Sequence, residues 1–142
     1  MMSETTKNLA AGGCYCGALR YTAQLDGPVA GQCHCRACQH IAGGGPQYFH
    51  LVSPTGFQWH RGQPAQFRHP LPDTPVTRSF CGTCGTHILT QRSDQTALVL
   101  KVGTLDDPSG FVPRVAICFD EAQPFHTIAD GLPTFDGIPR AK

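Results

Sequence analysis

The chain has 142 residues, a formal net charge of +1 and only 15% charged residues. This length fits one domain, and the near-neutral charge gives no electrostatic reason to expect a nucleic acid or an anionic membrane as a partner. No apolar stretch approaches the roughly 20 residues that a membrane span needs, so we expect a soluble, cytoplasmic protein.

Sixteen glycines and twelve prolines favour many short strands joined by turns over a helical bundle. Alternating apolar residues from Leu19 to Leu25 predict the first half-buried strand, which the sequence Asp26-Gly27-Pro28 ends. One helical turn is predicted at 36–41, ended by three glycines at 43–45. Further strands are predicted at 29–33, 47–52, 57–59, 77–80, 86–91, 96–102 and 113–119. No repeat or linker divides the chain, so we predict a mainly β fold in a single domain.

The cysteines carry the strongest chemical signal. Structural zinc sites have four ligands, whereas catalytic sites keep one position open for water or substrate. Two pairs of cysteines together supply the four sulfurs of a closed site. The remaining cluster, a triad of cysteines, supplies three sulfurs, one fewer than a closed second site needs. The sequence therefore predicts two zinc ions, one structural and one catalytic and more labile. The clusters are Cys14 with Cys16, Cys81 with Cys84, and Cys33 with Cys35 and Cys38.

Disulfides are the alternative use of so many cysteines in a small chain. The first 13 residues are polar and mixed, without the cationic start and apolar stretch of a signal peptide. Two cysteines at C-x-C spacing also bridge each other poorly. In a reducing compartment such spacings indicate metal binding, so we favour metal over disulfides.

The two pairs of the predicted structural site are each followed by a glycine. Cys81-Gly82-Thr83-Cys84-Gly85 has the spacing of a zinc knuckle, whose glycines admit positive φ and leave backbone amides facing the thiolates. Cys14-Tyr15-Cys16-Gly17 is shorter. Residues i and i+2 of a strand share one face, so we expect this pair to present both sulfurs from a strand.

The triad of Cys33, Cys35 and Cys38 can cap one face of a metal ion and leave the fourth position free. Three thiolates make zinc less electrophilic, which favours carrying an incoming thiol as thiolate over generating hydroxide. The glycines at 43–45 directly follow and allow a substrate to approach closely.

Two alternatives concern the fourth ligand and the remaining cysteine. His34, His40 or His87 would make both zinc sites structural if it closed the second one, because zinc accepts imidazole readily. Cys118 stands alone in a predicted apolar strand. We interpret it as a small buried hydrophobic residue and assign it no role.

At these residues the chain resembles the glutathione-dependent formaldehyde-activating enzyme family. The resemblance covers about 12–135. We expect 1–142 to form one domain, with 1–11 and 136–142 as its flexible ends. Two positions depart from it: Ala116 stands where the family often has histidine, and Phe125 where it often has tryptophan. The motifs that carry the resemblance are Cys14-Tyr15-Cys16-Gly17, Cys33-His34-Cys35-Arg36-Ala37-Cys38, Phe80-Cys81-Gly82-Thr83-Cys84-Gly85-Thr86, Gly103-Thr104-Leu105-Asp106-Asp107-Pro108 and Ile128-Ala129-Asp130-Gly131-Leu132-Pro133.

The resemblance implies a zinc-stabilised β-tent of short antiparallel strands, with the same division of the cysteines. It implies Cys14, Cys16, Cys81 and Cys84 as structural ligands, and the triad as ligands of the catalytic zinc. The implied activity is a carbon–sulfur lyase reaction, the reversible formation of S-hydroxymethylglutathione from glutathione and formaldehyde.

Two other functions compete with this lyase. A non-catalytic zinc module that binds a protein partner would have a closed second site. A redox enzyme resembling peptide methionine sulfoxide reductases would need a reactive cysteine outside the zinc clusters. Only Cys118 is available for that role, and its apolar setting is expected to raise its pKa.

Overall fold

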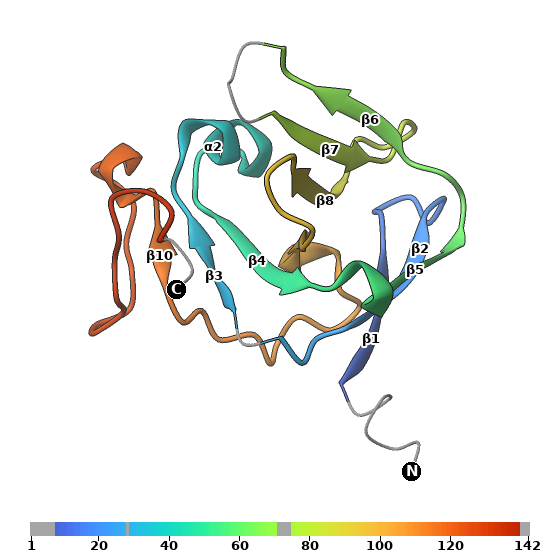
Figure 1. Cartoon of the computed structure of the whole chain (residues 1–142), viewed down its shortest axis with the longest axis horizontal. Helices are drawn as coiled ribbons and strands as arrows, with labels where there is room; N and C mark the ends of the chain where they lie inside the picture. The colour runs from blue at the N-terminus through green and yellow to red at the C-terminus, as the bar shows by residue number, and fades with distance from the viewer. Residues whose placement is uncertain (1–7, 28, 71–74, 140–142) are drawn as a thin grey trace. The chain divides into compact units, whose positions relative to one another are not determined.

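The computed structural model describes residues 8–27, 29–70 and 75–139. Pro28 of the predicted turn and the outermost residues of both expected flexible ends lie outside this part of the chain. The chain divides into two compact units, a first unit within 1–28 and 50–110 and a second unit within 29–49 and 111–142 (Figure 1). That the whole chain forms one domain stays a prediction.

The first unit contains a three-stranded antiparallel sheet in the order β1-β2-β5. Its second strand confirms the predicted alternation, with Leu19, Tyr21 and Ala23 buried. The strands are β1 (Leu9–Gly13), β2 (Arg20–Gln24) and β5 (Phe57–Arg61).

β1 begins at Leu9, inside the range 1–11 that was expected to be a flexible end. Its sequence of one leucine, two alanines and two glycines carries no alternation, so the pattern did not predict a strand. Pairing with β2 defines it, from Leu9 opposite Gln24 to Gly13 opposite Arg20. Gly12 permits this approach, because a Cβ there would lie 2.4 Å from the Tyr21 hydroxyl oxygen.

Four further strands of the first unit, β6, β7, β8 and β9, pair side by side in that order. Ile88 and Leu100 are fully buried and form part of its core. β6 was not predicted, because three of its four side chains are exposed and give no apolar alternation. The bounds are β6 (Ala65–Arg68), β7 (Val76–Phe80), β8 (His87–Arg92) and β9 (Leu98–Lys101).

The second unit holds one α-helix, α2 (Arg36–Ala42), within the described residues. It exceeds the predicted turn by one residue and ends at Gly43, whose φ of 84° gives the left-handed conformation. β3 (Ala30–Cys33) precedes the helix, and β4 (Gln47–Val52) begins in this unit.

β10 (Ala116–Ile117) is a two-residue strand where a seven-residue strand was predicted. It lies beside β3 (Figure 1) and pairs with it in parallel, unlike the antiparallel strands of the first unit. Ile117 is opposite Cys33 in this pairing. Three short 3-10 helices complete the described elements: η1 (Pro54–Gly56), η2 (Val102–Thr104) and η3 (Phe119–Glu121). No helix in the described part of the chain has both the length and the hydropathy that crossing a bilayer requires.

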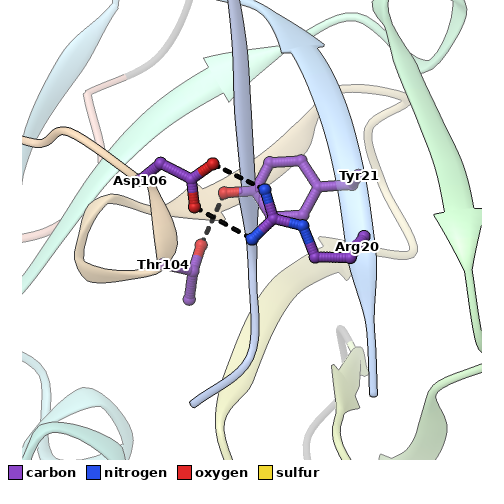
Figure 2. Close-up of polar contacts among 4 residues, drawn as sticks. All are labelled: Arg20, Tyr21, Thr104 and Asp106. Atoms are coloured by element: carbon purple, nitrogen blue, oxygen red, sulfur yellow. Dashed lines mark hydrogen bonds and ion pairs between the residues drawn. The ribbon is translucent and has the colours of Figure 1, made fainter. Parts of the chain in front are cut away.

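Two polar contacts fix β2 against the segment after β9 in the first unit (Figure 2). The Arg20 guanidinium donates to both carboxylate oxygens of Asp106, at 2.9 and 2.5 Å. The buried Tyr21 hydroxyl lies 2.6 Å from Thr104 Oγ1, which itself donates to the Lys101 carbonyl at 2.8 Å. Thr104 Oγ1 therefore accepts a hydrogen bond from the Tyr21 hydroxyl. The two contacts hold the start of β2, close to the first cysteine pair, in place.

Candidate functional site

The first unit brings the two cysteine pairs together. The Sγ atoms of all four cysteines lie within 4.8 Å of one another. Cys14 and Cys16 Sγ are 3.7 Å apart, and Cys16 and Cys81 Sγ are 3.8 Å apart. Sulfurs at the corners of a tetrahedron around zinc, with Zn–S of about 2.3 Å, are separated by about 3.8 Å. The donor set therefore fits a tetrahedral zinc, which Cys14, Cys16, Cys81 and Cys84 would hold.

Cys14 and Cys16 lie in the turn between β1 and β2, not on a strand face as expected. Gly17 closes this turn with a φ of 84°, and its amide donates to the Cys14 carbonyl at 3.1 Å. The Leu19 amide donates to Cys14 Sγ at 3.2 Å. A glycine-closed turn, rather than strand alternation, thus brings the two sulfurs together.

The Cys81–Cys84 segment has the knuckle geometry that its spacing predicts. The Thr83 and Cys84 amides donate to Cys81 Sγ at 3.3 and 3.4 Å. Gly85, with φ of 82°, donates its amide to the Cys81 carbonyl at 2.9 Å. The Thr83 and Cys84 amides stabilise negative charge on the Cys81 sulfur, as a thiolate ligand requires.

Thr86 connects the two turns, which sequence reasoning did not foresee. Its Oγ1 accepts from the Tyr15 amide at 3.1 Å and lies 3.2 Å from Cys84 Sγ, to which its hydroxyl can donate. Hydrogen bonds from Thr86 lower the pKa of Cys84 to about 5, favouring the thiolate. The sequence signal that could have identified Thr86 was a hydroxyl residue two positions after the knuckle cysteine Cys84.

Replacing Thr86 with valine is expected to weaken zinc binding at the first site by about 10- to 100-fold, the usual effect of removing a hydrogen-bond partner of a metal ligand. Competition with a chromophoric chelator measures this affinity. The Thr86→Ser variant keeps the hydroxyl and should bind zinc like the unmodified chain. Equal affinity of the valine variant would show that Thr86 does not support the site.

The second unit brings the triad together at the junction of β3 and α2. Cys33 is the last residue of β3, Cys35 caps the helix, and Cys38 lies in the first helical turn. Their three Sγ atoms lie within 4.8 Å of one another, and the Cys38 amide donates to Cys35 Sγ at 3.3 Å. Hydrogen bonds from the thiols of Cys118, Cys33 and Cys38 lower the pKa of Cys35. The triad fits one face of a zinc site.

Cys118 is buried, as expected, and lies beside the triad although it stands alone in the sequence. The neighbouring thiol of Cys33 lowers the pKa of Cys118, but Cys35 and burial outweigh this effect and raise the pKa to about 12. The parallel pairing of β10 with β3 brings these residues together, and nothing local in the sequence indicates that pairing.

His34, proposed as one possible fourth ligand, is fully buried with both ring nitrogens engaged. Its Nε2 lies 3.1 Å from Gln32 Nε2, and its Nδ1 lies 2.9 Å from His126 Nδ1. Since the amide nitrogen of Gln32 only donates, His34 Nε2 accepts and its Nδ1–H donates to His126. His34 therefore has no free nitrogen for zinc in this arrangement.

The other two histidines offered as fourth ligands lie elsewhere. His40 is exposed on α2. His87 belongs to the first unit, and its buried Nδ1 has no hydrogen-bond partner among the described residues. Neither histidine belongs to the group of metal-binding side chains that Cys33, Cys35 and Cys38 form.

His126 ties the glycine loop to the triad and was missed from the sequence. With Nδ1 accepting from His34, its Nε2–H donates to the Gly44 carbonyl at 2.8 Å. Gly43 and Gly44 have φ of 84° and 121°, and a Cβ added at either would meet open space. The loop thus leaves room for a ligand, while two hydrogen bonds connect it to the residue between Cys33 and Cys35.

Together, the mainly β fold and the two cysteine clusters define a protein with two groups of thiols that could bind metal ions. A family model described as glutathione-dependent formaldehyde-activating enzyme matches residues 9–121. The chain belongs to this family, which confirms the resemblance.

A structural neighbour supports the fold. The crystal structure of a Rhodobacter sphaeroides protein, a structural genomics target, is similar to this chain with a TM-score of 0.59 and 20% sequence identity. The match covers 88% of this chain and 98% of that one. No curated protein matches the chain.

Proposed function

We propose that this protein is a zinc-dependent carbon–sulfur lyase acting on a thiol–aldehyde adduct of the S-hydroxymethylglutathione type. The observation that carries the proposal is the triad of Cys33, Cys35 and Cys38, gathered within 4.8 Å in a member of this family. The partners are a small thiol such as glutathione and an aldehyde. A reducing compartment, with the cytoplasm expected from the sequence, keeps the thiols available to zinc.

Cys33, Cys35 and Cys38 would hold the catalytic zinc. When bound, zinc lowers the pKa of a coordinated thiol, so that the sulfur is a nucleophile near neutral pH. Three cysteine ligands already donate negative charge, and the chain therefore favours thiol chemistry over the formation of hydroxide.

The residues around the triad would bind the substrate thiol and orient it. The Cys38 amide supports negative charge on Cys35, and the His34–His126–Gly44 hydrogen bonds hold the glycine loop at a fixed place relative to the triad. Because no side chain covers Gly43 or Gly44, the loop backbone can approach a bound thiol closely.

The reaction balances without an oxidant or reductant. The thiol sulfur forms a bond to the carbonyl carbon, and the carbonyl oxygen receives the proton that the thiol gives up. The reverse direction breaks the carbon–sulfur bond and returns the aldehyde and the thiol, which is the lyase direction. Proximity of the two reactants and activation of the sulfur supply the rate enhancement.

NMR exchange spectroscopy tests this proposal, because thiols react with formaldehyde spontaneously and only the rate can reveal an enzyme. The interconversion of glutathione and its hydroxymethyl adduct should accelerate with the protein and return to background with the Cys38→Ser variant. Other thiols and aldehydes run in parallel identify the preferred pair. If no pair exceeds the rate of that variant, the alternative of a zinc module that binds a protein partner becomes the better account.

A further inference from the structure

The peptide group between Gly44 and Gly45 differs from the rest of the glycine loop in its hydrogen bonds. The amides of Gly43 and Gly44 both donate to the Gln39 carbonyl near the end of α2, the second of them at 2.8 Å. The Gly44 carbonyl accepts from His126 Nε2 at 2.8 Å. The Gly45 amide has no acceptor among the described residues of the second unit, 29–49 and 111–139. Within this unit, one backbone donor of the loop is therefore left for a ligand.

The direction of this donor follows from the bond that holds the Gly44 carbonyl. A trans peptide points its C=O and its N–H in opposite directions, and the described part of the chain contains no cis peptide. Because the Gly44 carbonyl is held on the His126 ring, the Gly45 N–H faces away from that ring. A Cβ added at Gly44 or Gly45 would meet no atom within 4 Å, so no side chain blocks the approach of a ligand.

His126 is fixed in the tautomer that holds the Gly44 carbonyl. Its Nδ1 lies 2.9 Å from His34 Nδ1, which donates to it, and also accepts from the Gln123 amide at 3.3 Å. A neutral imidazole has one N–H, so two donors at Nδ1 leave the proton on Nε2, where it meets Gly44. His34 is fully buried, which gives this chain of hydrogen bonds a firm anchor.

The anchor belongs to the triad segment, because His34 lies between Cys33 and Cys35. A single imidazole ring, that of His126, separates His34 from the Gly44 carbonyl. In glutathione, carbon atoms join the sulfur to amide carbonyls and terminal carboxylates, whose oxygens accept hydrogen bonds. A donor one imidazole ring away from the triad segment suits those oxygens rather than the sulfur and the aldehyde, which would react at the triad itself.

We propose that the Gly45 amide binds an acceptor oxygen in the peptide part of the thiol substrate, and that His126 is the positioning residue that aims this amide. The inference rests on the proposed function for the class of substrate, a thiol that carries amide or carboxylate groups. The loop then determines thiol specificity, because a thiol without such an oxygen cannot form this hydrogen bond. The contact is one of binding only, and no covalent bond is made or broken at the loop.

Amide NMR spectroscopy on the zinc-loaded protein tests the binding without any turnover. Glutathione should shift the Gly45 N–H resonance downfield, as a new hydrogen bond does, whereas ethanethiol, which has no oxygen, should leave it in place. The His126→Phe variant keeps a ring but has no N–H, and it should lose this shift. His126→Gln offers both an acceptor for His34 and a donor for Gly44, and it should recover part of the shift. A Gly45 resonance that glutathione does not move would overturn the proposal.

Kinetics then separates a positioning role of His126 from a purely structural one. The ratio of kcat/KM for glutathione to kcat/KM for ethanethiol should fall about tenfold in His126→Phe, the effect of losing roughly one hydrogen bond to the substrate. Most of this fall should be a higher KM for glutathione, and His126→Gln should restore part of the ratio. Gly45→Pro removes the donor itself and should give the same fall, so it serves as a second variant if His126→Phe folds poorly.

Two outcomes divide this inference from the proposed function. An unchanged ratio in His126→Phe, with both thiols slowed equally, would overturn the positioning role of His126. If neither thiol reacts faster than background while glutathione still shifts the Gly45 resonance, the lyase proposal fails and the binding role of the loop stands.

Discussion

Replacing Cys84 with serine should lower the free energy of unfolding by at least about 3 kcal/mol, because structural zinc contributes apparent folding free energies on the order of 10 kcal/mol. In the first unit this cluster joins the turn between β1 and β2 to the turn between β7 and β8. Those turns belong to different groups of paired strands, so zinc there would close a long loop that the unfolded chain leaves open.

Thermal unfolding followed by circular dichroism measures this effect, with an expected fall in melting temperature of about 10 °C or more. Soluble yield should fall as well. The matched control is Cys38→Ser, the same chemical change at the other cluster. A Cys84→Ser variant as stable as the unmodified chain would show that this cluster does not stabilise the fold.

Replacing Cys38 with serine should remove one zinc and abolish thiol–aldehyde chemistry while leaving the fold intact. Cys38 lies in the first turn of α2, and its triad is confined to the short segment from the end of β3 into this helix. A metal there closes only a small loop, so its loss costs little in chain entropy. The hydrogen bonds of His34 and Gln39, which join this segment to 121–126, do not involve Cys38.

Metal analysis should find about one zinc per chain in Cys38→Ser, with four-ligand binding at the other cluster unchanged. The melting temperature should lie within a few degrees of that of the unmodified chain, as for a local change. If Cys38→Ser unfolds as readily as Cys84→Ser, both sites are structural, and the lyase proposal loses its main support.

The parts that the sequence predicted well depend on local spacing. The knuckle at 81–85 and the helix ended by Gly43 each depend on residues within one turn of each other. The spacing of those residues in the sequence was therefore enough to predict both. The alternation around Tyr21 likewise predicted β2. The family was identified from combined local motifs of this kind.

The parts that were missed depend on pairing between distant segments. β1 and β6 lack alternation, and their strand conformation comes from their partners. Cys118 was interpreted as isolated because the residue before it, Ile117, pairs with Cys33, which lies 84 residues earlier in the chain. His126 belongs to no motif, and the motif that Thr86 ends assigns it no role; both roles arise from hydrogen bonds to residues far away in the chain.

The central claim is that the two cysteine clusters hold zinc unequally, one for the fold and one for chemistry. Native mass spectrometry during graded chelation tests it most directly, because it counts the metal ions on each folded molecule. The expected result is two zincs at the start, early loss of one from a chain that stays folded, and retention of the other until the chain unfolds. Simultaneous loss of both zincs, or disulfides among the clustered cysteines, would contradict the account.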